Sequence, residues 1–263
     1  MGTGGTDPLD WVWHWDGMRL QWCVRSGAVV HKVGEEPAAG MAQLKEVLLA
    51  LKSKGMTGDS VTWAKRHADF ALAPGWVDTA SAGDVFRLQM GGHPGGVQVH
   101  RSEGGGEDWA LIEAADVELE DWVCGLWPQA VRKSGAFACL EGWGRVARMA
   151  GRGGVRVFWD LAPDRALGSV WKGGELRWAL AGGAQVPDDL LYLTVNALHR
   201  QGLPVEGTEV VWSGEVAQGD AMWEGVGRFF APMSLLVPDE QVHRMAEPDL
   251  RLHRWWGLLN LGV

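Results

Sequence analysis

The sequence predicts an α/β protein of two lobes, each built on the element order β-β-β-α-β. Three observations lead to this fold class. Residues 11–33 contain three short apolar runs separated by turn residues, which is typical of a meander of antiparallel strands. A helical apolar pattern over 41–53 follows, and another short apolar run at 60–64 completes the unit. The same order of elements returns about 145 residues later in the chain.

The first unit is marked by its turns and by its periods. Asp16-Gly17 ends the apolar run 11–15 and is a strong hairpin signal. Residues 18–25 then alternate between apolar and polar side chains, the period of a half-buried strand. Within 41–53, apolar residues recur at intervals of three and four, which predicts an amphipathic helix. The strand that follows most simply returns to the sheet of the meander.

The second unit repeats this order with different side chains. It consists of predicted strands at 155–159, 165–171 and 175–180, a helix at 187–201 and a strand at 208–212. Trp159-Asp160 falls opposite Trp15-Asp16 when the halves are aligned. Internal duplication is the simplest account of the repeat.

The remaining segments extend the two units. We predict strands at 97–101, 109–113 and 234–237, and helices at 119–127, 137–149, 221–230 and 250–261. An acidic, Gly-rich loop at 103–108 lies between the first two of these strands. Arg152-Gly153-Gly154 marks the expected boundary between an N-terminal lobe, 1–152, and a C-terminal lobe, 153–263.

The composition excludes several classes of function. The formal charge is −9 and the basic residues are scattered, so nucleic acid and anionic membranes are poor partners. The first ten residues lack the pattern of a signal peptide, and no run approaches the ~20 apolar residues that span a bilayer. We therefore expect a cytoplasmic protein with no direct membrane insertion.

Tryptophan and cysteine are both expected in the core. The chain has 17 Trp but one Tyr and one Ile, together with many Gly, Ala and Val. This bias suggests a GC-rich gene in which Trp fills core positions, although Trp is also a favoured anchor in binding surfaces. Cys23, Cys124 and Cys139 are widely spaced in apolar surroundings, so we expect buried thiols rather than disulfides or a metal site.

The two-lobed plan resembles the actin-like ATPase fold, which actin, sugar kinases, Hsp70 chaperones, PilM and GspL share and whose lobes are ribonuclease H-like. In detail the chain resembles a bacterial family known as domain of unknown function 3822. The phrases FALAPGWVD (70–78), DDLLYLTVNALHRQGLPVEGTEVVWSGEV (188–216) and LHRWWGLLNL (252–261) carry this second resemblance. The resemblance implies a fold and almost no activity, because one fold hosts many functions.

Nucleotide-binding members of this superfamily use two Gly-containing hairpins, each led by an Asp, to hold phosphates and a metal. Asp16-Gly17 occupies the first hairpin position, but bulky residues follow it at once. Asp160 leads the second, where Leu161 replaces glycine and Pro163 removes a donor N–H. Both hairpins are interpreted as turns rather than as phosphate clamps.

The segment 210–216 resembles the strand-Gly-helix that packs against adenosine in this fold. The usual pair of glycines is here Gly214-Glu215, and a Glu side chain would crowd or repel a nucleotide. We expect the relic of a site. If a nucleotide binds at all, Asp16, Gly17, Asp160 and Gly214 are the residues that would hold it.

No other catalytic motif emerges from the sequence. The eight histidines form no HxxxH or HExxH pair, so a metal site is not expected. The acidic run 113–121 is better explained as a helix start, where the helix dipole favours carboxylates, than as a cation site.

The leading hypothesis is a degenerate, non-catalytic platform that needs no cofactor and binds another protein, whose identity the sequence does not reveal. Self-association is an open alternative for its surfaces. Exposed Trp would be natural anchors, and the terminal helix with Trp255 and Trp256 is either such an anchor or core.

The rival hypothesis is an ATP-dependent kinase or ATPase in which Asp16 and Asp160 hold Mg²⁺. The two differ in the cleft, which a platform would fill with side chains such as Met18, Leu161 and Glu215. A small-molecule site unrelated to ATP is a third alternative.

Overall fold

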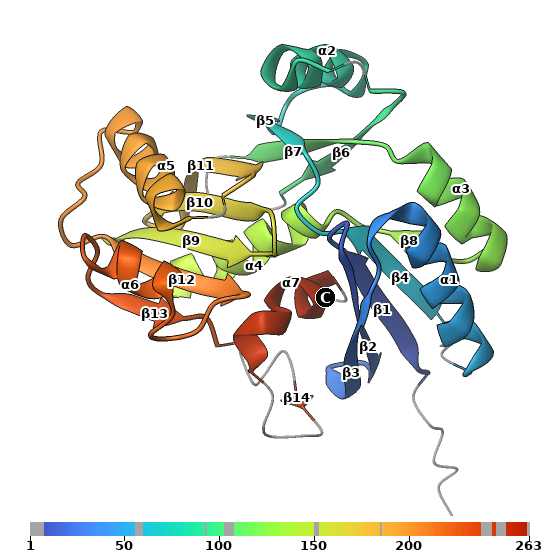
Figure 1. Cartoon of the computed structure of the whole chain (residues 1–263). Coiled ribbons are helices and arrows are strands. Elements are labelled where there is room, and N and C mark those ends of the chain that lie inside the picture. Colours follow the sequence, from blue (N-terminus) through green and yellow to red (C-terminus); the bar gives the residue numbers. More distant parts are fainter. Residues whose placement is uncertain are drawn as a thin grey trace, which may run out of the picture.

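A meander of three strands, a helix and a fourth strand form the core of the first lobe in the computed structural model (Figure 1). The structure describes residues 8–55, 60–92, 94–102, 108–149, 153–184, 186–237 and 251–261, and the backbone of 244–245. The first unit consists of β1 (Asp10–Trp15), β2 (Arg19–Ser26), β3 (Val29–Pro37), α1 (Gly40–Ser53) and β4 (Ser60–Lys65). Strand β4 pairs in parallel with β1, as the predicted return to the meander requires.

The second lobe repeats the sheet order of the first. Its unit consists of β9 (Val155–Leu161), β10 (Ala166–Lys172), β11 (Glu175–Gly182), α5 (Pro187–Arg200) and β12 (Glu209–Gly214), followed by α6 (Ala221–Gly227) and β13 (Met233–Leu235). The order β11-β10-β9-β12 matches β3-β2-β1-β4, and in each lobe the first and fourth strands are parallel. The predicted α/β fold class with two lobes of one plan is confirmed.

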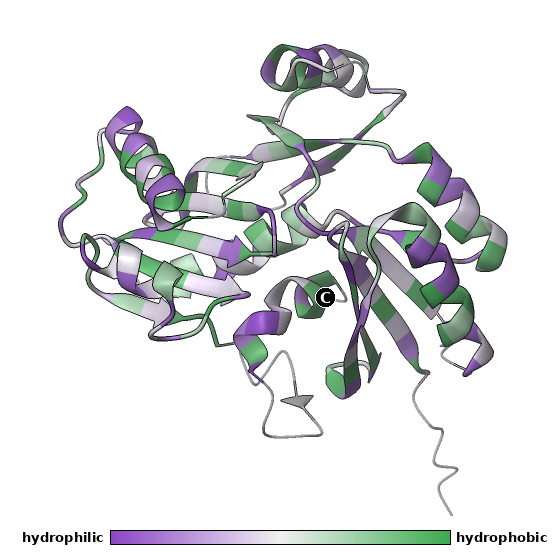
Figure 2. Cartoon of the chain, viewed as in Figure 1, coloured by the Kyte–Doolittle hydropathy of each residue, from purple (hydrophilic) through white to green (hydrophobic). Residues whose placement is uncertain are grey.

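The helices of both units form where the apolar period predicted them. Leu44, Leu48 and Leu51 are the buried residues of α1, and Leu190 and Leu198 are among those of α5. Figure 2 shows hydrophobic and hydrophilic residues on different sides of these helices. None of the described helices is long and apolar enough to cross a membrane.

A small third sheet lies beside the two large ones, and the sequence patterns predicted only part of it. It is formed by β5 (Phe70–Pro74), β6 (Val97–Arg101) and β7 (Trp109–Ala114), with α2 (Thr79–Met90) against it. Strand β5 and helix α2 were not predicted. Their local signals were nevertheless present, because Asp78 caps the first turn of α2 through the Ser81 N–H and Gly91 ends the helix with φ 73°.

The end of the chain returns to the first lobe. Its sheet is completed by β8 (Val131–Arg132), which follows α3 (Val117–Leu126), and by β14 (Arg244–Met245). The segment predicted as one terminal helix is a 3₁₀ turn, Leu252–Trp255, followed by α7 (Trp256–Leu261). Helix α7 lies between the two lobes and packs against α4 (Gly135–Met149) (Figure 1). Trp255 and Trp256 are buried there, so they belong to the core.

Most tryptophans are core residues, and glycines on the neighbouring strand make room for two of them. Trp22 lies opposite Gly34 in the β2–β3 pair, and Trp159 lies opposite Gly168 in the β9–β10 pair. A Cβ at Gly34 would come within 2.2 Å of the Trp22 ring, and one at Gly168 within 2.4 Å of the Trp159 ring. Each indole therefore covers a backbone that only glycine leaves free.

Candidate functional site

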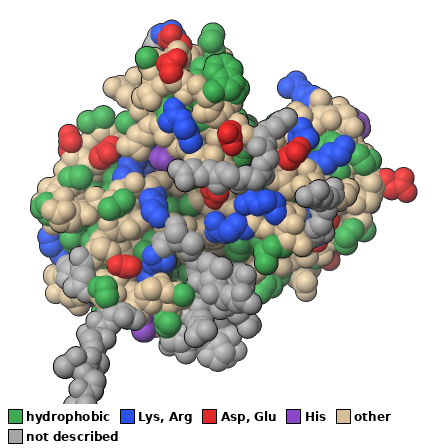
Figure 3. All heavy atoms as spheres, turned by 180° about the vertical axis from the view of Figure 1, so that it is seen from behind, with side chains coloured by type: hydrophobic (Ala, Val, Ile, Leu, Met, Phe, Trp, Pro, Cys, Tyr) green, Lys and Arg blue, Asp and Glu red, His purple; other side chains and the backbone are tan. Residues whose placement is uncertain are grey.

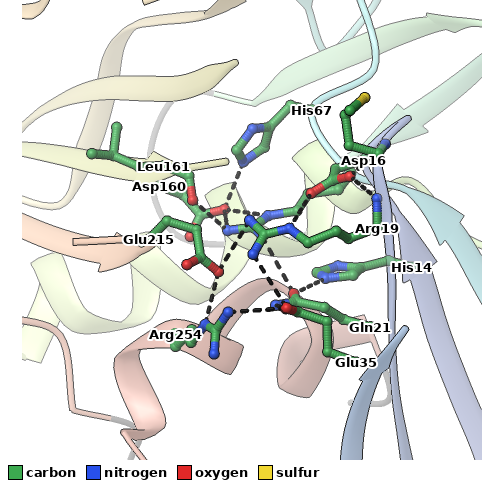
Figure 4. A network of polar contacts seen from close by, with 12 residues as sticks. His14, Asp16, Arg19, Gln21, Glu35, His67, Asp160, Leu161, Glu215 and Arg254 are labelled. Atoms are coloured by element: carbon green, nitrogen blue, oxygen red, sulfur yellow. Dashed lines mark hydrogen bonds and ion pairs between the residues drawn. The ribbon is translucent and has the colours of Figure 1, made fainter. Parts of the chain in front are cut away.

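The two lobes meet at a cleft where β1 and β9 end (Figure 4). A cavity of about 610 Å³ opens there. Residues from both lobes line it, among them Asp16, Gly17, Lys65, Asp116, Asp164 and Arg165. Of the four residues that the sequence singled out, Asp16 and Gly17 therefore line this cavity, whereas Asp160 is fully buried beside it.

Asp16 uses its carboxylate to build the first hairpin. Its Oδ1 accepts hydrogen bonds from the backbone N–H groups of Met18, at 2.9 Å, and Arg19, at 2.6 Å. Gly17 between them has φ 98°, a conformation that favours glycine. The carboxylate is thus bound to its own turn, as in an Asx-turn.

Asp160 is enclosed by three side chains from both lobes. Its Oδ2 accepts from Arg66 Nε at 3.0 Å, from Arg66 Nη2 at 2.9 Å and from His67 Nε2 at 2.6 Å. Its Oδ1 accepts from the Ser213 hydroxyl at 2.8 Å. Arg66 and His67 directly follow β4 in the first lobe, so the carboxylate of the second hairpin is paired with the opposite lobe.

The charges of this cluster follow from its burial and its partners. Burial disfavours a charged carboxylate, but the Arg66 charge and the hydrogen bonds from His67 and Ser213 outweigh it and hold the pKa of Asp160 far below its usual range. Burial lowers the pKa of His67, so its ring is neutral near pH 7. Because ionised Asp160 only accepts hydrogen bonds, the proton of His67 lies on Nε2. His67 also has a positive φ of 52°, a strained conformation that this contact helps to hold.

Gly214 serves the approach of Arg66. Its φ is 81°, and a Cβ there would lie 2.1 Å from the Leu161 carbonyl oxygen and 2.6 Å from Arg66 Nη2. Arg66 Nη2 donates to that same carbonyl oxygen at 2.8 Å. The glycine that the sequence placed at an adenine-binding position therefore faces a guanidinium group.

A ring of four alternating charges crosses the cleft below Asp160 (Figure 4). Glu35 on β3 contacts Arg19 at 3.2 Å and Arg254 at 3.1 Å. Glu215, which follows β12, contacts the same two arginines at 3.4 and 2.8 Å. Each charge in the ring has two opposite neighbours, and the ring joins three parts of the chain that are far apart in sequence.

Gln21 connects the ring to the buried aspartate. Its Nε2 donates to Glu35 at 2.7 Å, and its Oε1 accepts from Arg66 Nη1 at 3.3 Å and from His14 Nε2 at 2.6 Å. Burial, and next the Arg66 charge, lower the pKa of His14 to about 3, so this ring is neutral as well. One polar network thus runs from β1 to the C-terminal segment.

The side chains that close the cleft are partly those expected from the sequence. Glu215 takes part, as predicted. Met18 is 47% exposed, and Leu161 packs into the core of the second lobe, so these two expectations were wrong. Arg66 and Arg254, which the sequence analysis did not assign to the cleft, form ion pairs there with Asp160 and Glu215.

Two further expectations can be compared with the structure. Asp116 in the acidic run accepts from the Leu119 N–H and caps α3, as expected of a helix start. Cys23 and Cys139 are buried, but Cys124 is exposed on α3, which corrects the expectation for that thiol. Within the described ranges, no group of three or more His, Cys, Asp or Glu side chains is arranged to hold a metal ion.

Several solved structures share this architecture. A protein from Bacteroides thetaiotaomicron VPI-5482 with an actin-like ATPase fold and unknown function is similar with a TM-score of 0.73 and 11% identity, over 97% of this chain and 96% of that one. A chain of the PilM–PilN type IV pilus biogenesis complex is similar with a TM-score of 0.64 and 11% identity, over 96% of this chain and 97% of that one. The cytoplasmic domain of EpsL is also similar, with a TM-score of 0.53 and 13% identity, over 97% of this chain and 95% of that one. EpsL is an inner-membrane component of the type II secretion system of Vibrio cholerae.

These likenesses establish the fold and leave the family open. The chain has the actin-like ATPase fold, as the sequence predicted. No family model matches the chain. No curated protein matches it in sequence either. Membership of the domain of unknown function 3822 family therefore stays a prediction.

Proposed function

On this actin-like scaffold, we propose a non-catalytic platform that binds another protein and does not use ATP. The proposal rests on one observation, the enclosure of Asp160 by Arg66. Mg²⁺ is held by carboxylate oxygens together with substrate phosphates. Here the carboxylate of the second hairpin is fully buried and its Oδ2 already accepts two N–H bonds from a guanidinium group. The residues at this position do not fit a metal–nucleotide complex.

The rest of the cleft supports the same proposal. Freeing Asp160 for a metal would leave the Arg66 charge buried without its partner, which typically costs several kcal/mol. The Glu215–Arg254 pair occupies the position that resembles an adenosine-binding segment. These ion pairs between the lobes support the interpretation of both hairpins as turns and not as phosphate clamps.

Binding of a protein partner is supported by the solved relatives and by one side chain. A PilM chain forms a complex with PilN, and EpsL is a component of a secretion system. Of the 17 Trp in this chain, all of which lie in described segments, Trp76 alone is exposed, at 84%. Its loop is held on both sides, because Arg101 donates to the carbonyl oxygens of Gly75, at 3.3 Å, and Val77, at 2.7 Å. A rigidly held, exposed Trp is the usual form of a binding anchor.

Calorimetric titration with ATP and Mg²⁺ tests the absence of nucleotide binding. We expect no saturable heat up to millimolar nucleotide. Binding at micromolar affinity that Asp16→Asn abolishes would contradict the proposal and favour the alternative, an ATP-dependent kinase or ATPase with atypical phosphate loops. Asp16→Asn keeps an acceptor oxygen for the turn and removes the charge that a metal would need.

Position-specific photo-crosslinking in the producing organism tests the partner. A photoreactive residue at Trp76 is expected to give a discrete protein adduct. The same residue at Tyr192, which is 69% exposed on α5 in the other lobe, is the matched control. Equal labelling from the two positions would mean that Trp76 is not an anchor. An adduct that contains a second copy of this chain would assign the surface to self-association.

A further inference from the structure

A second cavity, of about 360 Å³, lies where the end of β8, the first turns of α4, strand β6 and the end of α7 meet. The polar side chains that line it include His100, Arg132, Lys133, Glu141, Arg145 and Asn260. None of these residues lines the interlobe cavity described above. The cavity is therefore a separate site on the first lobe.

Positive charge dominates the walls of this cavity. Arg132, Lys133 and Arg145 line it together with the carboxylate of Glu141. The side chain of Arg132 is only 5% exposed, and its two Nη atoms bond to Glu113 and Glu120. Its Nε has no hydrogen-bond partner among the described residues. Arg145 donates to Asn260 Oδ1 at 2.6 Å, which fixes the guanidinium at the cavity wall.

His100 contributes an unused buried nitrogen. Burial, and next the Arg132 charge, lower the pKa of His100 to about 4, so the imidazole is neutral near pH 7. Its Nε2 is buried and has no hydrogen-bond partner within the described part of the chain. The ring packs against Phe137 of α4 at 5.5 Å between centroids. A buried ring nitrogen without a hydrogen-bond partner is energetically costly.

Helix α4 adds to the positive potential. It is 15 residues long and starts beside the cavity at Gly135, so the positive end of its dipole lies at this wall. Ser134 precedes the helix and accepts from the Phe137 N–H at 3.2 Å. In the view from behind, Lys and Arg side chains gather near the centre of the face, on the side where α4 lies (Figure 3).

We propose that this cavity binds a small molecule through a phosphate or carboxylate group. Lys133 and Arg145 supply the charges for the oxyanion. The side chain of Phe137 forms an apolar wall for the rest of the molecule. Cavities of a few hundred Å³ with a few converging polar groups are the usual form of small-molecule sites.

The site also predicts a coupling between binding and protonation. His100 faces Arg132 and Lys133 at the end of β8, and Glu141 and Arg145 on α4. Without a ligand, burial and next the Arg132 charge oppose a proton on His100. A bound dianion reverses the balance, so His100 takes up a proton on binding and the affinity rises as the pH falls.

Titration of the full chain with sulfate, at constant ionic strength, tests the site. Sulfate keeps its charge between pH 7.5 and 5.5, and inorganic phosphate and succinate as parallel probes distinguish a phosphate ligand from a carboxylate one. We expect saturable binding that Lys133→Gln and Arg145→Gln each weaken by about tenfold. Lys172→Gln, an exposed lysine on β10, is the control and should leave the affinity unchanged.

The pH series gives an independent readout. Sulfate affinity should rise by roughly threefold between pH 7.5 and 5.5 in the wild type, and His100→Gln should retain binding but lose this rise. Equal sulfate affinity in Lys133→Gln, Arg145→Gln and Lys172→Gln would mean a general salt effect and would overturn the proposal. An absence of saturable binding by any of the three probes would overturn it as well.

Discussion

Arg66 and Asp160 meet across the lobe boundary with two N–H groups of one guanidinium on a single carboxylate oxygen, at 3.0 and 2.9 Å. Both side chains are almost completely buried. Because each charge depends on the other, this pair links the first lobe to the second hairpin. It also supports the proposal that Asp160 does not hold a metal–nucleotide complex.

Removing one partner of this pair should be strongly destabilising. In Arg66→Met the buried carboxylate keeps only His67 and Ser213, and we expect the free energy of unfolding to fall by about 3–5 kcal/mol. Urea denaturation followed by circular dichroism measures the change. Arg87→Met, which breaks the exposed pair with Asp84 on α2, is the control and should cost at most about 1 kcal/mol. Equal losses in the two variants would contradict the role assigned to Arg66.

The protein should become less stable as the pH is lowered below neutrality, because the folded state keeps buried histidines neutral. His14 has a pKa of about 3 in the folded chain and about 6.5 when unfolded, so the unfolded state binds more protons between these values. The free energy of unfolding should decline by about 1.4 kcal/mol per pH unit for each such histidine once the pH is well below 6.5. His67 acts in the same direction. The lowered pKa of Asp160 adds a loss only below its unfolded value near 4.

A variant separates the contribution of His14. His14→Gln removes the titrating ring. The slope of the unfolding free energy against pH, between pH 6 and 5, should therefore decrease by the equivalent of about one bound proton, roughly 1.4 kcal/mol per pH unit. Urea denaturation at several pH values measures the slope. An unchanged slope would show that His14 is already protonated in the folded state.

The glycines under the large indoles should not tolerate a methyl group. Gly34→Ala and Gly168→Ala place a Cβ within 2.2 and 2.4 Å of Trp22 and Trp159. We expect each to lower the unfolding free energy by roughly 1–3 kcal/mol through overpacking. Gly83→Ala, on α2 with open space around its Cβ, should instead be neutral or stabilise by up to about 1 kcal/mol. Thermal or urea unfolding decides between these signs.

Trp76 should react separately from the other tryptophans. Limited oxidation with N-bromosuccinimide is expected to modify one Trp rapidly in the folded protein, because Trp76 is the exposed one. Peptide mass spectrometry locates the product, and Trp76→Phe should abolish the fast phase. Fast modification at several positions would contradict the packing described for the two lobes.

The sequence predicted the parts of the fold that depend on local patterns. The hairpin at Asp16-Gly17, the period of α1 and the repeat of one plan in both halves all come from neighbouring residues, and the structure agrees with them. Strand β5 was missed because its sequence, FALAP, has no alternation of polar and apolar residues. The 3₁₀ turn before α7 was missed because its apolar residues continue the helical period.

The closure of the cleft was predicted only in part. Glu215 was recognised because it breaks a local pair of glycines. Arg66 was not recognised, since a contact with Asp160, 94 positions further along the chain, leaves no signal in either segment. Leu161 was assigned to the cleft because it replaces a glycine, yet the alternation of β9 turns its side chain into the core. Contacts between distant segments are the part that local patterns do not specify.

Helix α7 determines the order in which the lobes can be completed during synthesis. Val12 and Cys23, on the inner face of the first sheet, are covered by Leu258 and other residues of the C-terminal segment. The ribosome makes that segment only after the whole second lobe. The first lobe therefore waits, with part of its apolar face uncovered, until the rest of the chain has emerged. The two lobes share one plan, but the first lobe cannot complete its folding before the second has been synthesised.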